Sequence, residues 1–168
     1  MIQENNFDEL YRCARKVGTM FIESLTEGLL KSNINPEEYL TKLPEYYMFN
    51  NLNCRNVKLS ITEFQGTNHF SGSLINSIQF AEGTTHIPQA CCAYCYDLSS
   101  VTIPASVQYI RAHAFIGCSH LKYVVFKGTI EQWNKIIVEY SDLVWQNVPA
   151  DHVLCIDGKC SLIPVYTN

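Results

Sequence analysis

The cysteines are the residues whose spacing could most directly support chemistry. Cys92 and Cys95 have the spacing of a pair of zinc ligands, and Cys91 lies next to them. Cys155 and Cys160 could supply the other half of a four-cysteine site. The same cluster could instead be redox-active. A zinc or thiol-based redox centre built on Cys91, Cys92 and Cys95 is therefore one hypothesis for the function.

A histidine and a cysteine that are close in sequence suggest a second kind of chemistry. His113 and Cys118 could form a nucleophile pair within one short segment. No third group that would orient the histidine lies at a matching spacing, so we interpret the histidines as solvent-facing residues. The sequence also contains no glycine-rich phosphate loop and no G-x-S-x-G motif. We therefore expect a protein that is not an enzyme.

The composition argues against several other classes of protein. The 168 residues include 12 Lys and Arg and 16 Asp and Glu, a formal net charge of −4, so direct nucleic-acid binding is not expected. Hydrophobic residues make up 47% of the chain and can form a core, but no apolar run reaches the roughly 18 residues of a membrane helix. The acidic start is unlike a secretory signal. We expect a cytoplasmic protein with free thiols and no membrane partner.

A repeat with a constant period organises the middle of the chain. An apolar pattern at positions i, i+3 and i+5 begins at Ile75, recurs at Leu98 and recurs again, at the same offset, at Leu121. Each unit ends in the alternation of a short strand, which Pro104 stops in the second unit. One unit is too small to bury its own apolar face, so we expect successive units to stack and their strands to pair in parallel. The residues of the pattern are Ile75, Ile78, Phe80, Leu98, Val101, Ile103, Leu121, Val124 and Phe126.

Four longer motifs accompany the repeat. They are V-T-I-P-A-S-V-Q-Y-I at residues 101–110, F-I-G-C-S-H-L-K-Y-V at 115–124, G-T-I-E-Q-W-N-K-I at 128–136 and V-L-C-I-D-G at 153–158. Together they resemble the core, terminal and closing motifs of the BspA-like leucine-rich repeats, over about residues 75–162. The resemblance implies a short leucine-rich-repeat solenoid with parallel β-strands and a mixed C-terminal cap. Together with a helical N-terminal cap, which the spacing of the first 50 residues predicts, the expected fold class is α+β.

Two units depart from the family pattern. Residues 90–95 read A-C-C-A-Y-C where the pattern expects A-F-x-G-C, so we expect the turn of this unit to be reshaped. Further upstream, Cys54, Val57 and Leu59 form only a degenerate candidate unit.

The repeat also offers another interpretation of the cysteines. Cys95 and Cys118 occupy matching positions in successive units, and Cys92 occupies the position of Phe115. A buried free cysteine behaves as a small hydrophobic residue. We favour this interpretation and expect neither a metal nor a cofactor.

The tail is expected to close the solenoid. Trp133 should cover the last coil, whereas Trp145 either packs on the same cap or lies exposed. The Asp-Gly dipeptide at 157–158 lacks the acidic series of a calcium loop, so we interpret it as the turn of a hairpin between residues 153–156 and 160–163.

The N-terminal third has a different spacing of apolar residues. Apolar residues at three- and four-residue spacing predict an amphipathic helix over residues 7–31. Asn35 is a suitable N-cap for a second helix that ends near Lys42. These helices either cap the first coil or form a separate interaction module, which divides the chain into residues 1–50 and the solenoid at residues 51–168.

The expected function is non-enzymatic binding of another protein through the outward side chains of the strands. This face is nearly neutral, so its affinity should depend on Tyr123 and apolar contact more than on charge. A small intracellular inhibitor or adaptor, such as a phage-encoded antagonist of a host defence protein, is one alternative, and the thiol-based protein is the other. The residues predicted to face the partner are Ser77, Gln79, Ser100, Thr102, Tyr123, Val125 and Lys127.

Overall fold

The computed structural model describes residues 55–59, 62–64 and 66–164. The helices expected within residues 1–50, and with them the helical N-terminal cap, lie outside the described residues. The strands are β1 (Asn56–Lys58), β2 (Ser77–Gln79), β3 (His86–Ile87), β4 (Ser100–Ile103), β5 (Tyr109–Ile110), β6 (Tyr123–Phe126), β7 (Ile137–Val138), β8 (His152–Cys155) and β9 (Gly158–Ser161). The helices are α4 (Ile130–Trp133) and α5 (Ser141–Val144).

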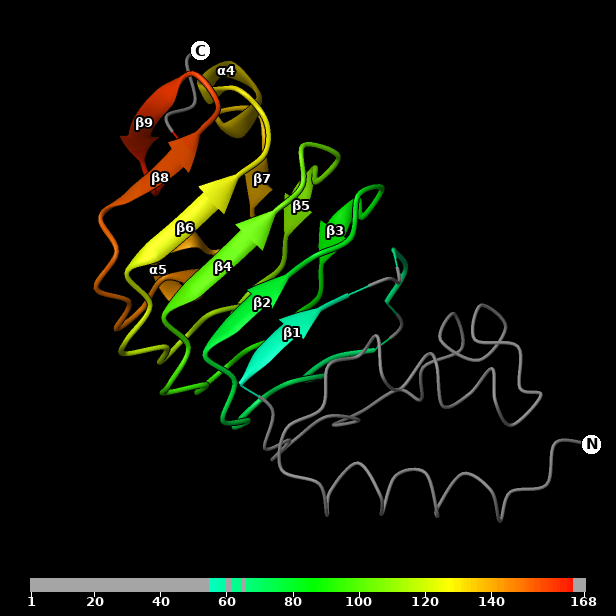
Figure 1. The fold of residues 1–168 in the computed structure, drawn as a ribbon, viewed down its shortest axis with the longest axis vertical. Coiled ribbons are helices and arrows are strands. Elements are labelled where there is room, and N and C mark those ends of the chain that lie inside the picture. The colour runs from blue at the N-terminus through cyan, green and yellow to red at the C-terminus, as the bar shows by residue number, and fades with distance from the viewer. Residues whose placement is uncertain (1–54, 60–61, 65, 165–168) are drawn as a thin grey trace, which may run out of the picture.

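Six strands form the larger sheet, in the order β1-β2-β4-β6-β8-β9 (Figure 1). Neighbouring strands are parallel except β8 and β9, which form an antiparallel hairpin. Ser77, Ser100 and Tyr123 are register partners, so β2, β4 and β6 recur at the constant offset that the sequence predicted. Asn56 pairs with Ser77, at a slightly shorter offset. The degenerate upstream unit is therefore a coil of the solenoid.

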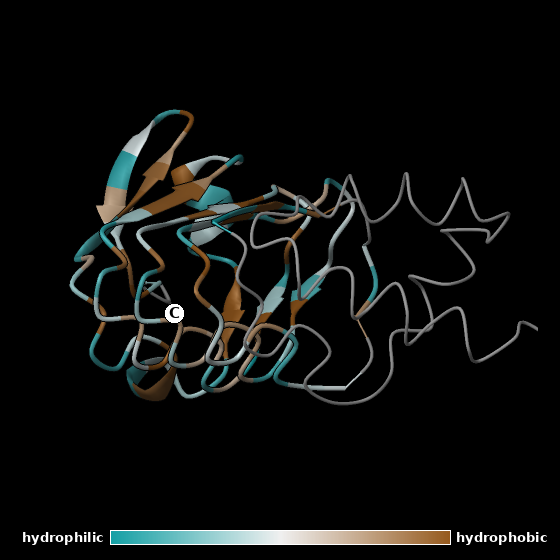
Figure 2. Ribbon diagram, turned by 60° about the horizontal axis from the view of Figure 1, so that its bottom comes forward, coloured by the Kyte–Doolittle hydropathy of each residue, from teal (hydrophilic) through white to brown (hydrophobic). Residues whose placement is uncertain are grey.

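A second, three-stranded parallel sheet contains β3, β5 and β7. The two sheets lie on different sides of a shared interior, and the β8–β9 hairpin stands at the end of the larger sheet away from β1 (Figure 1 and Figure 2). Pro88 directly follows β3 and Pro104 directly follows β4. Because proline cannot donate a backbone hydrogen bond, these residues stop the strands and let the chain bend into the next side of the coil.

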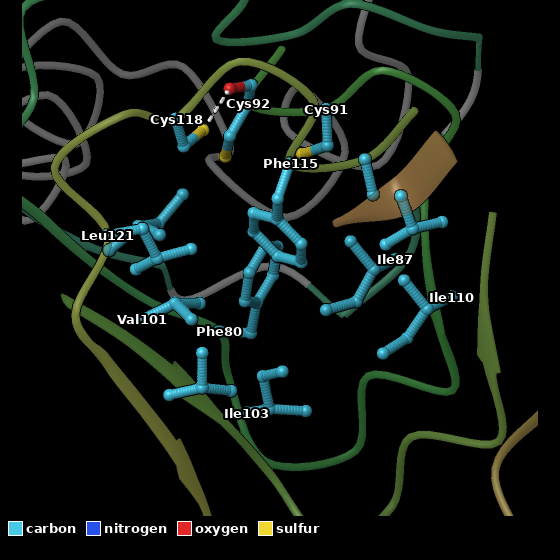
Figure 3. Close-up of a cluster of buried hydrophobic side chains, with 14 of the residues drawn as sticks. Phe80, Ile87, Cys91, Cys92, Val101, Ile103, Ile110, Phe115, Cys118 and Leu121 are labelled. Carbon is cyan, nitrogen blue, oxygen red and sulfur yellow. Dashed lines mark hydrogen bonds between the residues drawn. The ribbon is translucent and has the colours of Figure 1, made fainter. Parts of the chain in front are cut away.

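The core fills the space between the two sheets. In Figure 3, Phe80 and Phe115 point into its centre. Strand residues of the larger sheet and Ile87 and Ile110 of the smaller one surround these rings. All nine residues of the predicted apolar pattern are at most 2% exposed. The prediction of their inward orientation is confirmed.

Each coil also turns at two residues with a left-handed backbone. At the first position the residues are Asn68 (φ 61°), Ala90 (φ 52°) and His113 (φ 61°). At the second they are Gly72 (φ 69°), Tyr94 (φ 58°) and Gly117 (φ 73°). The turns stack through backbone hydrogen bonds between successive coils.

The turn of the unit at residues 90–95 is not reshaped, contrary to the expectation. Tyr94 adopts the left-handed conformation that glycine adopts in the neighbouring coils, although a residue with a Cβ is strained there by about 1–2 kcal/mol. Its backbone N–H donates to the carbonyl of Ile116 at 2.7 Å. We attribute the retained turn to this stacking, which holds the Tyr94 backbone in the left-handed conformation.

The helix α4 and the tryptophan at its end close the last coil. Thr129 caps α4, since its hydroxyl accepts from the N–H of Gln132 while the Gln132 side chain accepts from the N–H of Thr129. Trp133 is fully buried, packs edge-on against Phe126 with 5.4 Å between ring centroids, and donates from Nε1 to the carbonyl of Ser161 at 3.2 Å. Trp133 is thus the cap residue that the sequence predicted.

The C-terminal hairpin turns one residue earlier than predicted. Cys155 pairs with Gly158, so the turn consists of Ile156 and Asp157, and Gly158 is the first residue of β9. The Asp157 carboxylate accepts from the N–H of Ile130 at 2.9 Å, which ties the turn to the first residue of α4. No helix among the described residues is long and apolar enough to cross a membrane.

Candidate binding face

The outward side chains of the larger sheet form one continuous surface, which we call the strand face. Alternate residues of a strand point to opposite sides of a sheet, and here the inward ones are in the core. Adjacent outward residues lie in register; Thr102, for example, pairs with Val125, which pairs with Leu154. The strand face consists of Asn56, Lys58, Ser77, Gln79, Ser100, Thr102, Tyr123, Val125, His152, Leu154, Lys159 and Ser161.

The structure brings the seven sequence-predicted residues together. Six of them, on β2, β4 and β6, belong to the strand face. The seventh, Lys127, is exposed and directly follows β6.

Sequence reasoning missed the two ends of the strand face. On one side β1 adds Asn56 and Lys58, and on the other the β8–β9 hairpin adds four residues, among them Leu154 and Lys159. The repeat period did not reach them, because β1 precedes β2 by less than one period and β8 follows β6 by more than one. The degenerate unit around Val57 and Leu59 indicated a coil at β1, but sequence reasoning did not extend the predicted partner face to Asn56 and Lys58.

The two halves of the strand face differ in chemistry. Over β1, β2 and β4 lies an open hollow of about 240 Å³. Its outward lining residues, Asn56, Lys58, Ser77, Gln79, Ser100 and Thr102, are all polar, and we call this half the polar hollow. Over β6 and β8, Tyr123, Val125 and Leu154 form an apolar platform, in which Tyr123 is 58% and Leu154 is 37% exposed.

Hydrogen bonds fix the backbone beside the polar hollow. The Asn76 side chain donates to the carbonyl of Asp97 at 2.9 Å, and the Ser99 hydroxyl donates to the carbonyl of Asn76 at 3.0 Å. The Ser77 hydroxyl also donates to the Asn56 side chain at 2.7 Å. These side chains link neighbouring coils where their strands begin, so the strand face is held by contacts within the solenoid.

The cysteines lie away from the strand face, in the core. Cys91, Cys92, Cys95 and Cys118 are fully buried. Cys118 donates from Sγ to the carbonyl of Cys92 at 3.0 Å (Figure 3), and Cys95 donates to the carbonyl of Phe70 at 3.0 Å. Burial raises the pKa of the Cys92 and Cys118 thiols well above the ordinary value.

This environment is the reverse of what a reactive thiol needs. A nucleophilic cysteine acts as the thiolate, which burial without a compensating positive charge disfavours. Among the described residues, no group of three or more His, Cys, Asp or Glu side chains is placed to hold a metal ion. The proposed second half of a zinc site, Cys155 and Cys160, lies on the C-terminal hairpin, where burial raises the pKa of Cys155 to about 12.

The comparison with protein families decides what this solenoid is. A family model described as the BspA type leucine-rich repeat region, with 6 copies, matches residues 28–144. The chain belongs to the BspA-type leucine-rich repeat family. No curated protein and no solved structure gives a match. Leucine-rich repeat domains are protein-binding modules and are typically non-catalytic, so this leucine-rich repeat chain is a module that binds protein.

Proposed function

We propose that this leucine-rich repeat chain binds its protein partner through the strand face. The observation that supports the proposal most is the exposed apolar platform of Tyr123, Val125 and Leu154, on a sheet whose opposite side already forms the core. Folding does not require these side chains to be exposed together. A partner that covered them would gain the free energy of burying a tyrosine and two aliphatic residues.

The composition of the strand face is suited to an interface. Tyrosine is enriched among the residues that dominate binding energy, because it buries a large area while losing little conformational entropy. Around the apolar platform, hydroxyl and amide side chains such as Thr102 and Gln79 can form hydrogen bonds at the edge of a contact. Repeat solenoids offer such extended surfaces to macromolecules in general.

A module of this kind acts by occupying or bridging its partner, as an inhibitor or an adaptor does. The six cysteines that the structure describes are free thiols, four of them buried. We also propose that the encounter with the partner takes place inside the cell, in a reducing compartment where free thiols persist.

Site-specific photocrosslinking tests the proposal. The photoreactive residue p-benzoylphenylalanine would replace Gln79 or Thr102 on the strand face and, as a control, Tyr140, which is exposed after β7. In lysate of the source cell, we expect one crosslinked protein from both strand-face positions and none from the control. Equal crosslinking of that protein from position 140, or its co-purification without crosslinks from the strand face, would contradict the proposal.

A further inference from the structure

We propose, on the basis of the function proposed above, that the strand face binds an extended acidic segment of a protein that carries a bulky apolar side chain. The charge distribution is the first observation. The chain has a formal net charge of −4, yet none of the twelve residues of the strand face is Asp or Glu. The charged side chains there are lysines.

Two lysines border the apolar platform. Lys159 is the register partner of Leu154, on the strand beyond it. Lys127 follows Val125 by two positions and lies at the carboxyl end of β6. An apolar side chain placed on the platform would thus have an ammonium group on each of two sides.

Two carboxylates beside the C-terminal hairpin already have partners within the chain. Asp157 accepts from the N–H of Ile130 at 2.9 Å, and Asp151 accepts from the ring of its neighbour His152. The hydrogen bond from His152 holds the pKa of Asp151 below its ordinary value. Asp151 is exposed and also interacts electrostatically with Lys159. Carboxylates from a partner would therefore complement Lys127 and would share Lys159 with Asp151.

The shape of the strand face favours an extended segment. Five steps of about 4.8 Å between its six strands give a width of about 24 Å. An extended chain of about seven residues covers that distance. The polar hollow offers hydroxyl and amide groups to the main chain of such a segment, and the apolar platform offers a surface for one large side chain.

A uniform polyanion fits this surface less well than a peptide. DNA carries about one charge per 1.7 Å and binds through closely spaced cations. Here the lysines on or beside the strand face are Lys58, Lys127 and Lys159, and Lys58 lies on β1 at the opposite end of the sheet from Lys159. A segment that alternates carboxylates with an apolar anchor matches that separation. The chemistry therefore points to protein rather than to nucleic acid or an acidic polysaccharide.

Selection from a phage-displayed library of random dodecapeptides against the full chain tests the inference. The variant Lys127→Glu with Lys159→Glu removes the two cations of the platform. Arg111→Glu with Lys135→Glu is the matched control, because it produces the same net charge and alters residues outside the strand face. Circular dichroism would establish that both variants are folded.

We expect the selected peptides to contain Asp or Glu around an aromatic or aliphatic residue. Their affinity should fall about tenfold in Lys127→Glu with Lys159→Glu and stay within twofold in the control. Raising the salt concentration from 0.05 to about 0.5 M should weaken peptide binding to the unmodified chain. It should have less effect on peptide binding to Lys127→Glu with Lys159→Glu.

Other outcomes would overturn the inference in distinguishable ways. Selected peptides could lack acidic residues and yet bind more weakly to the variant Tyr123→Ala with Val125→Asp. That result would support the proposed function and refute the claim that the bound segment is acidic. Peptides insensitive to both sets of changes would refute the strand face itself. Failure to select any peptide would refute the claim that the strand face binds a short segment. Tighter binding of dextran sulfate or a DNA oligonucleotide than of the peptides would show that the lysines bind a polyanion.

Discussion

The indole ring of Trp145 stacks on the phenyl ring of Phe115, with 5.2 Å between centroids and 9° between the ring planes. Trp145 directly follows α5, and the next residue, Gln146, accepts from the N–H of Gly117 at 2.8 Å. The segment after α5 therefore continues the stack of turns beyond the coil that contains Phe115. Of the two positions expected for Trp145, the structure shows the packed one.

The inward residues of the strands should dominate stability. Leu121 is fully buried, so Leu121→Ala should lower the free energy of unfolding by about 2–5 kcal/mol, the range for truncating a buried leucine. Its neighbour Lys122 is exposed, and Lys122→Ala should change stability by less than about 0.5 kcal/mol. Urea unfolding of both variants measures the difference, and equal effects would contradict the stacking of the repeats.

Gly117 is required for two separate reasons. Its φ of +73° disfavours a side chain, and an added Cβ would lie 2.5 Å from Cδ1 of Tyr94. Gly117→Ala should therefore destabilise the chain by more than the roughly 1 kcal/mol of left-handed strain alone. In a Tyr94→Ala background the clash is absent, so the same substitution should cost less. A double-mutant cycle with no coupling between the two positions would show that the ring does not lie over the glycine.

The buried thiols should make the fold sensitive to alkali. Burial raises the pKa of Cys118 in the folded chain far above the roughly 8.5 of an unfolded cysteine. The folded state thus keeps its proton while the unfolded state loses it. The stabilisation is complete below about pH 8.5 and decreases as the pH rises above that value, by up to about 1.4 kcal/mol per unit for each such thiol.

Urea unfolding at pH 8 and pH 10 measures this effect. Tyrosines and lysines also titrate in this range, so Cys118→Ala serves as the comparison. The variant should lose less stability between the two pH values than the unmodified chain does. Equal losses would mean that the Cys118 thiol is not protected in the folded state.

The sequence was sufficient to predict the part of the fold that obeys a strict period. Leu98, Val101 and Ile103 could be assigned to the core because identical coils must stack with like residues in contact. The same reasoning placed Ser100 and Tyr123 on one face, since strand alternation fixes the side to which each residue points.

The rest depended on interactions between segments that have no common period. Between β6 and β8 the chain forms α4, β7 and α5, so the offset that places Leu154 beside Val125 could not be extrapolated. The turn at Tyr94 was mispredicted because local preference disfavours tyrosine with a positive φ, whereas hydrogen bonds to the next coil hold it there. The charge of the strand face was underestimated because Lys58 and Lys159 lie on β1 and on the hairpin, which do not follow the strict period.

The affinity of the crosslinked partner for one double variant tests the central claim most directly. Tyr123→Ala with Val125→Asp alters the apolar platform, and Tyr140→Ala with Ile137→Asp alters two exposed apolar residues at β7 as a matched control. If the strand face is the binding site, calorimetry should show that the first variant binds the partner more than tenfold more weakly, a loss of at least about 1.4 kcal/mol in binding free energy. The affinity of the control variant should stay within twofold of that of the unmodified chain. Unchanged affinity in the first variant, with both proteins folded, would contradict the claim that the partner binds through the strand face.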